Sequence, residues 1–293
     1  MLDKKKEILP TEKEILPFYM GYLPDRYQQK SFTELNDTPQ NRTNGLQRIK
    51  ELMKAEKIFE DQDFDDEYLE MFLRCQSYNV MDAFERLKNC LSLKKSHMFM
   101  FTHQKYENIE ICFTKSIVRF LPYRCADGCV VMLINVDNWN PEEFPVVEIK
   151  RMAPIILIHA LRDPMTQVNG FKAIIDASCN PLKHLKHCTF QNLYLMFHGS
   201  QNCLPGIFHE YHLVNPSIIS RFCLSVWKPF FSEELKKKIH VHSSPKGLLE
   251  FFPSQMIPTC YGGELGDYDM TPWLRDAMQP EMLDTLCGKA KCS

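Results

Sequence analysis

The alternation of short apolar runs with helical segments, between about residues 127 and 242, is the feature that most constrains the fold. Val130–Ile134 is a continuous apolar run, and such runs are typical of strands buried on both faces. Three further segments are strand-like: Phe171–Asp176, Ile207–Val214 and Ile239–His242. Residues with helical spacing lie between these strands, over 145–162, 189–203 and 217–227. Strands that alternate with helices predict an α/β layer with a mostly parallel sheet.

The first third of the chain is predicted to be helical. Thr38-Pro39 matches a helix N-cap followed by proline at the first helical position. Apolar residues then form three amphipathic faces, and the most regular of them combines Val80, Ala83, Phe84, Leu87 and Leu91. The acidic run Glu60–Asp66 interrupts this pattern and is predicted to be a loop. Because the apolar faces need a partner, we expect a small helical bundle over residues 40–95.

Charge and composition argue against several classes of protein. The 293 residues include 35 Lys and Arg against 37 Asp and Glu, a net charge of −2, so no strong field attracts nucleic acid and we expect no nucleic-acid partner. The first residues carry no apolar core of signal-peptide length, and no run approaches the ~20 apolar residues of a membrane span. We therefore expect a cytoplasmic protein whose 12 cysteines are mostly reduced, buried thiols.

Motifs for catalysis and for metal or cofactor binding are largely missing. The sequence has no Gly-x-Ser-x-Gly elbow, no phosphate loop and no Gly-x-Gly-x-x-Gly after a strand. Its histidines form three clusters: His184-x-x-His187, His209-x-x-His212 and His240-x-His242. On a strand His209 and His212 point to opposite faces, so only the third cluster could jointly hold a metal. No cysteine or carboxylate stands beside that pair, so we expect packed or surface histidines, no metal, no cofactor and no enzyme.

Two other features have both an ordinary and a functional interpretation. Lys236–Lys238 follows two glutamates on a predicted helix, and this run is either a solvated face with local ion pairs or a docking point for an anionic head group or membrane surface. The chain also contains 20 Phe, 11 Tyr and 15 Met. These side chains either fill a core, which composition alone favours, or form the walls of a cavity for an apolar ligand.

An ordered series of short motifs runs from about residue 35 to residue 265. Gln167–Asp176 has the pattern Gln-x-x-Gly-x-x-x-Ile-x-Asp, and four motifs follow it: His212–Pro216, Lys228–Phe230, Lys238–His242 and Tyr261–Gly263. Two segments precede it, Phe72–Cys75 and Ala83–Lys88. This series resembles the CRAL-TRIO lipid-binding domain family, and most closely its α-tocopherol transfer protein-like and retinaldehyde-binding branch.

The resemblance implies a fold and a division of the chain. Members have an all-α N-terminal lobe and an α/β lobe in which a mostly parallel sheet floors an apolar cavity under a mobile gate helix. The gate helix matches residues from about Asn215 to Phe231. We therefore expect an N-terminal tail (1–34), a helical subdomain (35–95), a lipid-binding domain (96–265) and a C-terminal tail (266–293).

The resemblance also implies a function. The expected activity is binding of a small hydrophobic molecule, such as a tocopherol, a retinoid or a similar lipid, and its transfer between membranes with transient membrane contact. Burial of a lipid tail gains about 0.8 kcal/mol per CH₂, and movement of the gate controls exchange. The alternative is a module that senses lipid, or recruits a protein or membrane partner, without carrying cargo. A zinc-dependent reaction through His240 and His242 is a distant third.

The resemblance places the cavity lining by position. These residues are Ala153, Leu157, Phe171, Ile175, Cys188, Met196, Leu204, Phe208 and Tyr211, and the apolar pattern adds Ile134 and Phe222. Phe171 and Ile175 share a strand face, as a common wall requires. Phe208 and Tyr211 share one only if a bulge lies between them.

One departure from the family concerns its basic cleft. Tocopherol- and retinaldehyde-carrying relatives use four basic positions of this cleft for phosphoinositide head groups. The corresponding residues are Ile207, His209, Glu234 and Lys238. Only Lys238 keeps a permanent positive charge, which makes phosphoinositide binding doubtful there. Lys236, Lys238 and His209 are the candidate residues for head-group or membrane docking.

Overall fold

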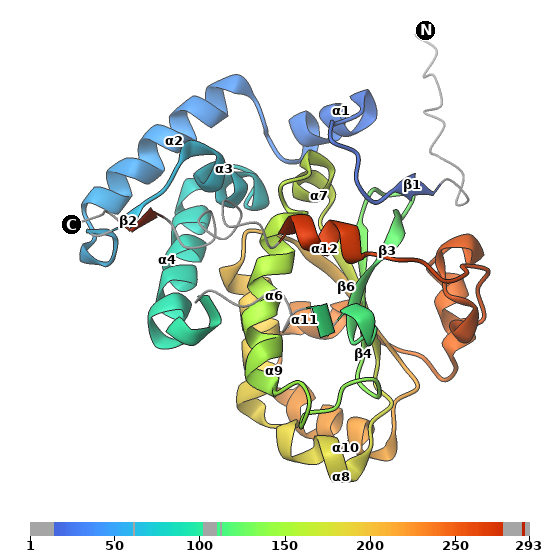
Figure 1. Cartoon of the computed structure of the whole chain (residues 1–293). Helices are drawn as coiled ribbons and strands as arrows, with labels where there is room; N and C mark the ends of the chain where they lie inside the picture. The colour runs from blue at the N-terminus through green and yellow to red at the C-terminus, as the bar shows by residue number, and fades with distance from the viewer. Residues whose placement is uncertain (1–14, 61, 102–109, 112, 278–288, 291–293) are drawn as a thin grey trace, which may run out of the picture.

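A six-stranded mixed sheet forms the centre of the computed structural model (Figure 1), which describes residues 15–60, 62–101, 110–111, 113–277 and 289–290. In spatial order the strands are β1 (Leu16–Pro17), β3 (Val118–Arg124), β4 (Val130–Asn135), β5 (Phe171–Asp176), β6 (Phe208–Val214) and β7 (Ile239–Val241). Strands β4 to β7 pair in parallel, whereas β1 and β3 are antiparallel additions at one edge. The predicted α/β fold with a mostly parallel sheet is therefore confirmed.

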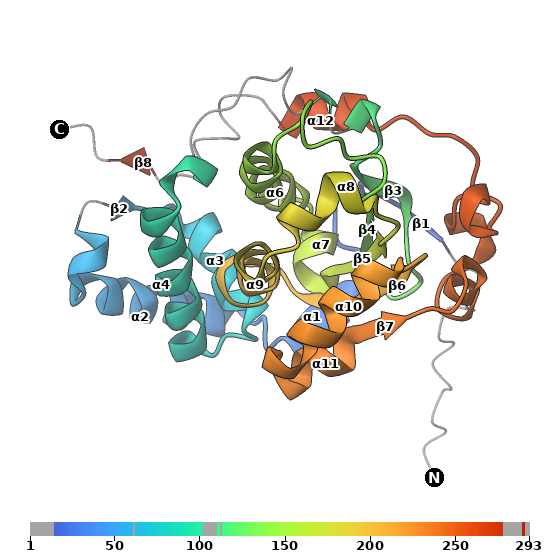
Figure 2. The same cartoon turned by 90° about the horizontal axis from the view of Figure 1, so that it is seen from below.

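The two faces of the sheet are covered by different parts of the chain. Along β4, Val130 and Met132 face the larger hydrophobic core under the helices, while Val131 and Leu133 face a second core. This alternation follows from the two-residue period of a strand. The helices α6 (Val146–Ala160), α7 (Pro164–Asn169) and α9 (Phe190–His198) lie on the first side, and the segment with Leu248 and Phe252 covers the other (Figure 2). Both faces are buried, which explains why the strand sequences are continuously apolar.

The helical lobe consists of α2 (Pro39–Lys54), α3 (Asp66–Cys75) and α4 (Val80–Ser96), within the region where a bundle is predicted. Thr38 caps α2 as expected, because its side chain accepts a hydrogen bond from the Asn41 amide. The acidic run that was predicted to be a loop contains a two-residue strand, β2 (Gln62–Asp63), which pairs with β8 (Lys289–Ala290). Asp65 then caps α3 by accepting from the amide of Tyr68 at 2.7 Å, so the end of this run starts a helix.

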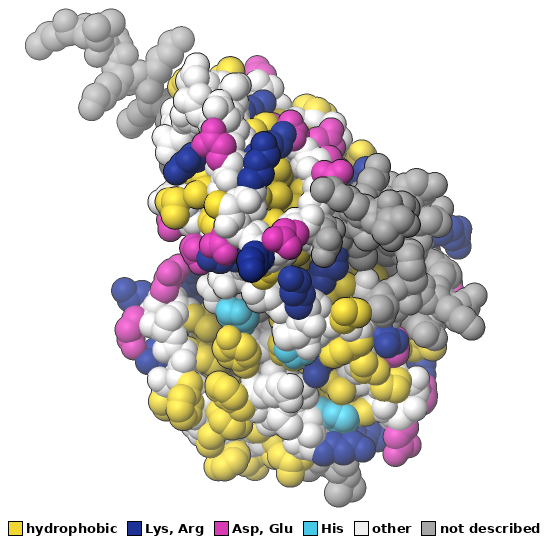
Figure 3. Space-filling model, turned by 90° about the vertical axis from the view of Figure 1, so that its left-hand side faces the viewer, with side chains coloured by type: hydrophobic (Ala, Val, Ile, Leu, Met, Phe, Trp, Pro, Cys, Tyr) yellow, Lys and Arg dark blue, Asp and Glu magenta, His cyan; other side chains and the backbone are white. Residues whose placement is uncertain are grey.

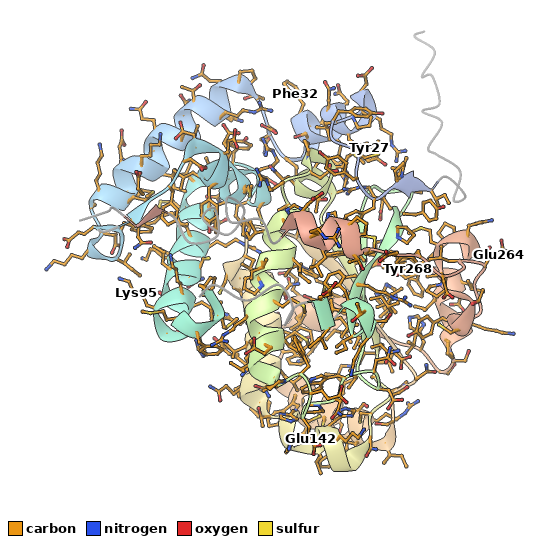
Figure 4. The ribbon with its side chains drawn as sticks, viewed as in Figure 1. Tyr27, Phe32, Lys95, Glu142, Glu264 and Tyr268 are labelled. Atoms are coloured by element: carbon orange, nitrogen blue, oxygen red, sulfur yellow. The ribbon has the colours of Figure 1, made fainter. Side chains whose placement is uncertain are left out.

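Ordered elements also lie in the segments that we expected to be tails. The helix α1 (Asp25–Glu34) belongs to the first segment, and Tyr27 donates a hydrogen bond to the Ala126 carbonyl at 3.0 Å (Figure 4). This bond ties α1 to the turn between β3 and β4. In the last segment, α12 (Thr271–Ala277) places Trp273 edge-on to Phe18 and Phe120, with ring centroids 5.3 and 5.1 Å away. Both segments therefore contribute to the hydrophobic core.

Strand β3 was not predicted, because two arginines and a proline interrupt its apolar pattern. Arg124 is fully buried, and its guanidinium lies 3.3 Å from a carboxylate oxygen of Asp163 and donates to Thr166 at 2.9 Å. A buried charge is tolerated only when it is paired in this way. Asp163 also caps α7 through the Met165 amide, so its position depends on two elements. Among the described helices, none has the length and apolarity that crossing a membrane requires.

Candidate functional site

An apolar cavity of about 330 Å³ lies between the sheet and the helices α6 and α9. Its floor is formed by side chains of three neighbouring strands: Met132 and Ile134 of β4, Ala173 and Ile175 of β5, and Phe208 and Tyr211 of β6. Ala153 and Leu157 of α6 and Met196 of α9 form much of its walls. The volume is at the lower end of the range of about 300–1,000 Å³ that is usual for ligand pockets. It has room for one small or single-chain molecule.

The residues of the floor alternate along each strand with the usual two-residue period, except on β6, where an extra residue interrupts the alternation. Ala173 and Ile175 are two positions apart on β5 and face the same side. On β6, Phe208 pairs with Phe171 and Glu210 pairs with Lys172, so His209 is an extra residue in this strand. This β-bulge shifts the following residues by one position and brings Phe208 and Tyr211 to the same face.

The structure brings together most of the residues that were predicted from the sequence to bind ligand. The lining contains Ile134, Ala153, Leu157, Ile175, Cys188, Met196, Leu204, Phe208 and Tyr211. Phe171 lies outside it, because this fully buried ring is stacked against Phe208 at 5.0 Å, beyond the end of the cavity. Phe222 also lies outside it, since its side chain is 65% exposed on the outer surface.

A hydroxyl network lies at one side of the cavity, and each of its groups has a partner. Ser200 donates to the Phe197 carbonyl at 3.1 Å, so the Tyr211 hydroxyl, 2.8 Å away, donates to Ser200. The amide of Gln201 donates in turn to the Tyr211 oxygen at 2.8 Å. Burial raises the pKa of Tyr211, which keeps the phenol neutral. The polar groups on this side of the cavity are therefore already hydrogen-bonded to one another and have little capacity left to bond a ligand.

Three basic side chains in the lining were not predicted from the sequence: Lys150 of α6, His184 of α8 (Pro181–His184) and His187. The ring of His184 is buried, and its Nδ1 accepts a hydrogen bond from the Asn180 amide at 2.9 Å. Its Nε2 therefore carries the proton and donates to the Trp139 carbonyl at 2.8 Å. Burial, followed by the nearby Lys186, His184 and Lys150, lowers the pKa of His187. The sequence shows that His184 and His187 are close together, but only the fold reveals that they line the cavity and that Lys150 lines it with them.

The helix α10 (Ile218–Trp227) matches the segment that was expected to be the gate, and it crosses the end of the sheet next to α8 (Figure 2). Ser217 caps it by accepting from the Ser220 amide at 3.1 Å, and the thiol of Cys179 lies 2.9 Å from the Ser217 hydroxyl. The thiol of Cys188, in the cavity lining, interacts with that of Cys223 on α10, and burial followed by this neighbour raises the pKa of Cys188 to about 12. Polar and thiol contacts therefore hold the inner side of α10.

The outer side of α10 is an exposed apolar stripe. On α10 its members, spaced four residues apart, are Ile218 (88% exposed), Phe222 (65%) and Val226 (38%), and Phe230 (70%) continues it in the short 3-10 helix Lys228–Phe230. Phe190 of α9 extends the stripe, because its ring contacts Trp227 and Phe230 at centroid distances of 5.2 and 6.0 Å. Figure 3 shows hydrophobic side chains gathered at the lower end of the molecule, where α10 lies in Figure 1. An exposed apolar patch of this kind is typical of a membrane or protein contact.

The three candidate docking residues do not form one cluster. Lys236 pairs with Glu233 at 2.7 Å, and Lys238 pairs with Glu234 at 3.1 Å on α11 (Glu233–Lys238). His209 hydrogen-bonds through Nε2 to the Asn169 carbonyl at 3.0 Å, and its pKa is lowered chiefly by burial.

Lys238 lines a separate open groove of about 730 Å³ beside α3 and α4. His209 and Lys236 do not line it, whereas Asp82, Glu85 and Glu234 do. Arg86 also lies there, but its guanidinium is buried and donates to the carbonyls of Leu204, Ser200 and Gly206. The described residues of this groove therefore do not form the cluster of available cations that a phosphorylated head group requires.

His212 of β6, His240 of β7 and His242, which follows β7, form a packed cluster beside the second core. His212 is fully buried, and its Nδ1 lies 3.0 Å from Nε2 of His242 while its Nε2 lies 3.0 Å from a carboxylate oxygen of Glu210. His240 stacks on the same ring with centroids 4.9 Å apart. Burial is the main cause that lowers the pKa of His212. Within the described part of the chain, no group of three or more His, Cys, Asp or Glu is arranged to hold a metal ion.

The model of the CRAL/TRIO domain family matches residues 114–263. Clavesin-1 of Xenopus laevis is 26% identical over 259 residues, which cover 87% of this chain and 78% of the relative. Clavesin-2 of Homo sapiens is 25% identical over 261 residues, which cover 87% and 79%. Among solved structures, the crystal structure of Sfh5 aligns with a TM-score of 0.40 and 13% identity over 86% of this chain and 92% of the other.

Proposed function

The chain belongs to the CRAL/TRIO domain family, a family of lipid-binding domains, and we propose that it binds one small hydrophobic molecule in the cavity between the sheet, α6 and α9 and carries it between membranes. The observation that carries this proposal is the cavity itself, which is about 330 Å³ in volume and has an almost wholly apolar lining. The chain's own side chains leave this space empty. An apolar ligand would bind there most favourably, because each CH₂ group that leaves water contributes about 0.8 kcal/mol to the free energy of binding.

Transfer between membranes requires that the bound and bilayer states have similar free energies. A lipid chain among Ile134, Leu157 and Ile175 has surroundings as apolar as those in the bilayer interior. The free-energy difference is then small, and the rate of exchange depends on how the protein opens. We propose that α10 is the moving element, because its inner side is held by polar and thiol contacts while its outer side is apolar.

Transient membrane contact through the stripe on α10 is part of this proposal. Ile218 and Phe222 on α10, and Phe230 in the short 3-10 helix that follows it (Lys228–Phe230), present large apolar side chains to solvent. Insertion of such side chains into the head-group region recovers free energy that is otherwise lost to water. Tocopherols and retinoids are the first candidate ligands. We propose that the protein carries them in the cytoplasm.

The test is uptake of a fluorescent apolar ligand by the purified full chain, followed by its transfer from loaded protein to acceptor vesicles. We expect binding of about one ligand per chain, and loss of that binding in Ile175→Asp, which places a carboxylate in the apolar floor. Ile175→Val is the matched control, because it keeps the lining apolar. Urea unfolding checks that both variants fold. Unchanged uptake by folded Ile175→Asp would show that this cavity is not the binding site.

The second candidate function is a module that senses lipid or recruits a partner without carrying cargo. The exposed apolar stripe on α10 is compatible with this function as well, because a protein or membrane partner could bind to it. The two functions differ in the transfer step. A chain that binds ligand and vesicles but never delivers the ligand to acceptor vesicles would favour the module over the carrier.

A further inference from the structure

The end of the cavity next to α8 carries basic groups, and the described residues of its lining include no acid. Lys150 and His187 both line the cavity, and the charged neighbours that influence His187 are Lys186, His184 and Lys150. All three are basic. Both ring nitrogens of His184 are already used, by the Asn180 amide and the Trp139 carbonyl, so this side chain is fixed in place and has no hydrogen bond left for a ligand. The unmatched polar groups at this end are therefore Lys150 and His187.

Lys150 is a half-buried lysine without an ion pair among the described residues. The nearest acid on its own helix, Glu148, accepts instead from Arg151 at 3.0 Å. Burial lowers the pKa of Lys150, and no acid offsets this effect. Most surface lysines extend their ammonium group fully into water, whereas this side chain lies along the cavity wall. A negative charge at this end of the cavity would stabilise it.

His187 supplies the second unmatched group. Its ring packs against Trp139 at a centroid distance of 5.0 Å, and its Nε2 is buried with no hydrogen-bond partner in the described structure. Most buried polar atoms are hydrogen-bonded, so an orphan nitrogen on a ring that lines a cavity calls for an explanation. One explanation is that a polar group of a bound ligand forms a hydrogen bond with this nitrogen. The same group would also pair with Lys150.

We propose that the preferred ligand is a single-chain lipid with a carboxylic acid head, bound with its carboxylate at Lys150 and His187 and its chain over Ile134 and Ile175. This inference rests on the proposed function and specifies its ligand. Two observations support it: the volume of about 330 Å³ has no room for a two-chain phospholipid, and the basic side chains of the described lining lie near His187, whereas the rest of the lining is mostly apolar. An ammonium and an imidazole N–H are both donors, and bonds from them to a carboxylate are charge-assisted. Among the retinoids this geometry favours the acid over the alcohol.

The experiment compares head groups at constant chain length. Tetradecanoic acid, tetradecanol and methyl tetradecanoate each compete with a fluorescent apolar probe for the full-length protein at neutral pH. We expect the acid to bind at least tenfold more tightly than the alcohol or the ester. Lys150→Met should remove this preference by weakening acid binding about tenfold while alcohol binding changes less than twofold. His187→Phe should weaken acid binding by a smaller factor, about threefold.

The matched control is Lys183→Met, which removes an exposed lysine of α8 that does not line the cavity and should leave the preference intact. Equal binding of acid and alcohol by the wild-type chain, or equal loss of both in Lys150→Met, would overturn the acid-head inference and leave the carrier function standing. If neither the probe nor any of the three competitors binds, measured directly by calorimetry, both the carrier function and the acid-head inference are wrong.

Discussion

Phe208 and Tyr211 stack with their ring centroids 5.7 Å apart and their planes inclined by only 5°, although three positions separate them along one strand. In a regular strand, residues three positions apart point to opposite faces of the sheet. The extra residue at His209 shifts Tyr211 to the same face as Phe208, so both rings form part of the floor of the cavity. A single local irregularity thus decides whether the third strand contributes one aromatic ring or two.

Tyr211→Phe should destabilise the chain without closing the cavity. The change removes the hydroxyl that bonds to Ser200 and Gln201 and keeps the ring on the floor. We expect a loss of about 1–2 kcal/mol in the free energy of unfolding in urea, with ligand uptake retained. Tyr19→Phe, at a side chain that is 69% exposed, should change neither quantity. A stability equal to that of the wild type would mean that the network is not formed in solution.

Ala153→Phe should fill the cavity from α6. The added ring enters space that is otherwise empty, so the folded chain gains contacts while the ligand loses its site. We expect uptake of the fluorescent ligand to fall more than tenfold and the urea midpoint to stay equal or rise. Ala153→Val should give an intermediate loss of uptake. A midpoint that drops sharply would show that the cavity is smaller in solution than the structure indicates.

Phe222→Asp should weaken membrane contact and leave the ligand site unchanged. The side chain is 65% exposed and outside the cavity lining, so a charge there meets water in the free protein and the head-group region in the bound one. We expect co-sedimentation with vesicles to fall about tenfold and ligand transfer to slow in proportion. Ser225→Asp places the same charge on another exposed position of α10 and should have a much smaller effect. Equal effects of the two variants would point to charge alone and not to the apolar stripe.

His159 should make stability fall as the solution becomes acidic. Its ring contacts Trp273 at 4.8 Å, its Nδ1 is buried without a partner in the described structure, and burial lowers its pKa from 6.5 to about 4. Between these two values the unfolded chain binds more protons than the folded chain, so the free energy of unfolding decreases as pH falls. We expect His159 to account for about 2 kcal/mol of the loss between pH 6.5 and 4, since one pKa unit corresponds to about 1.4 kcal/mol and partial exposure reduces the effect.

The measurement for His159 is urea unfolding of the wild type and His159→Phe from pH 7.5 down to pH 4. The variant keeps an aromatic ring against Trp273 and removes the titrating group. Its stability should therefore decrease less steeply over this interval, with the difference between the two chains constant above pH 7. Parallel curves throughout would show that other histidines cause the acid sensitivity.

The parts of the fold that could be predicted are those whose signals are local. Apolar runs such as Val130–Ile134 mark strands covered on both faces, and Asn-Pro pairs mark where strands end, so four strands and the α/β class followed directly. The same period places Ala173 and Ile175 on one face, the family resemblance predicted eight of the lining residues, and the apolar pattern added Ile134. The ligand and the role of each residue stay predictions.

The sequence by itself determined which segments are strands and helices and which residues have the character of a cavity wall, because hydrophobic period and breakers act over a few neighbouring positions. Only the tertiary structure decided that Arg124 is buried, that Arg86 of α4 holds three carbonyls near residues 200–206, and that Lys150 and His187 meet at one end of the cavity. Each of these depends on partners far apart in the chain. A charged side chain looks solvent-exposed in a sequence until the fold supplies the groups that compensate for its burial.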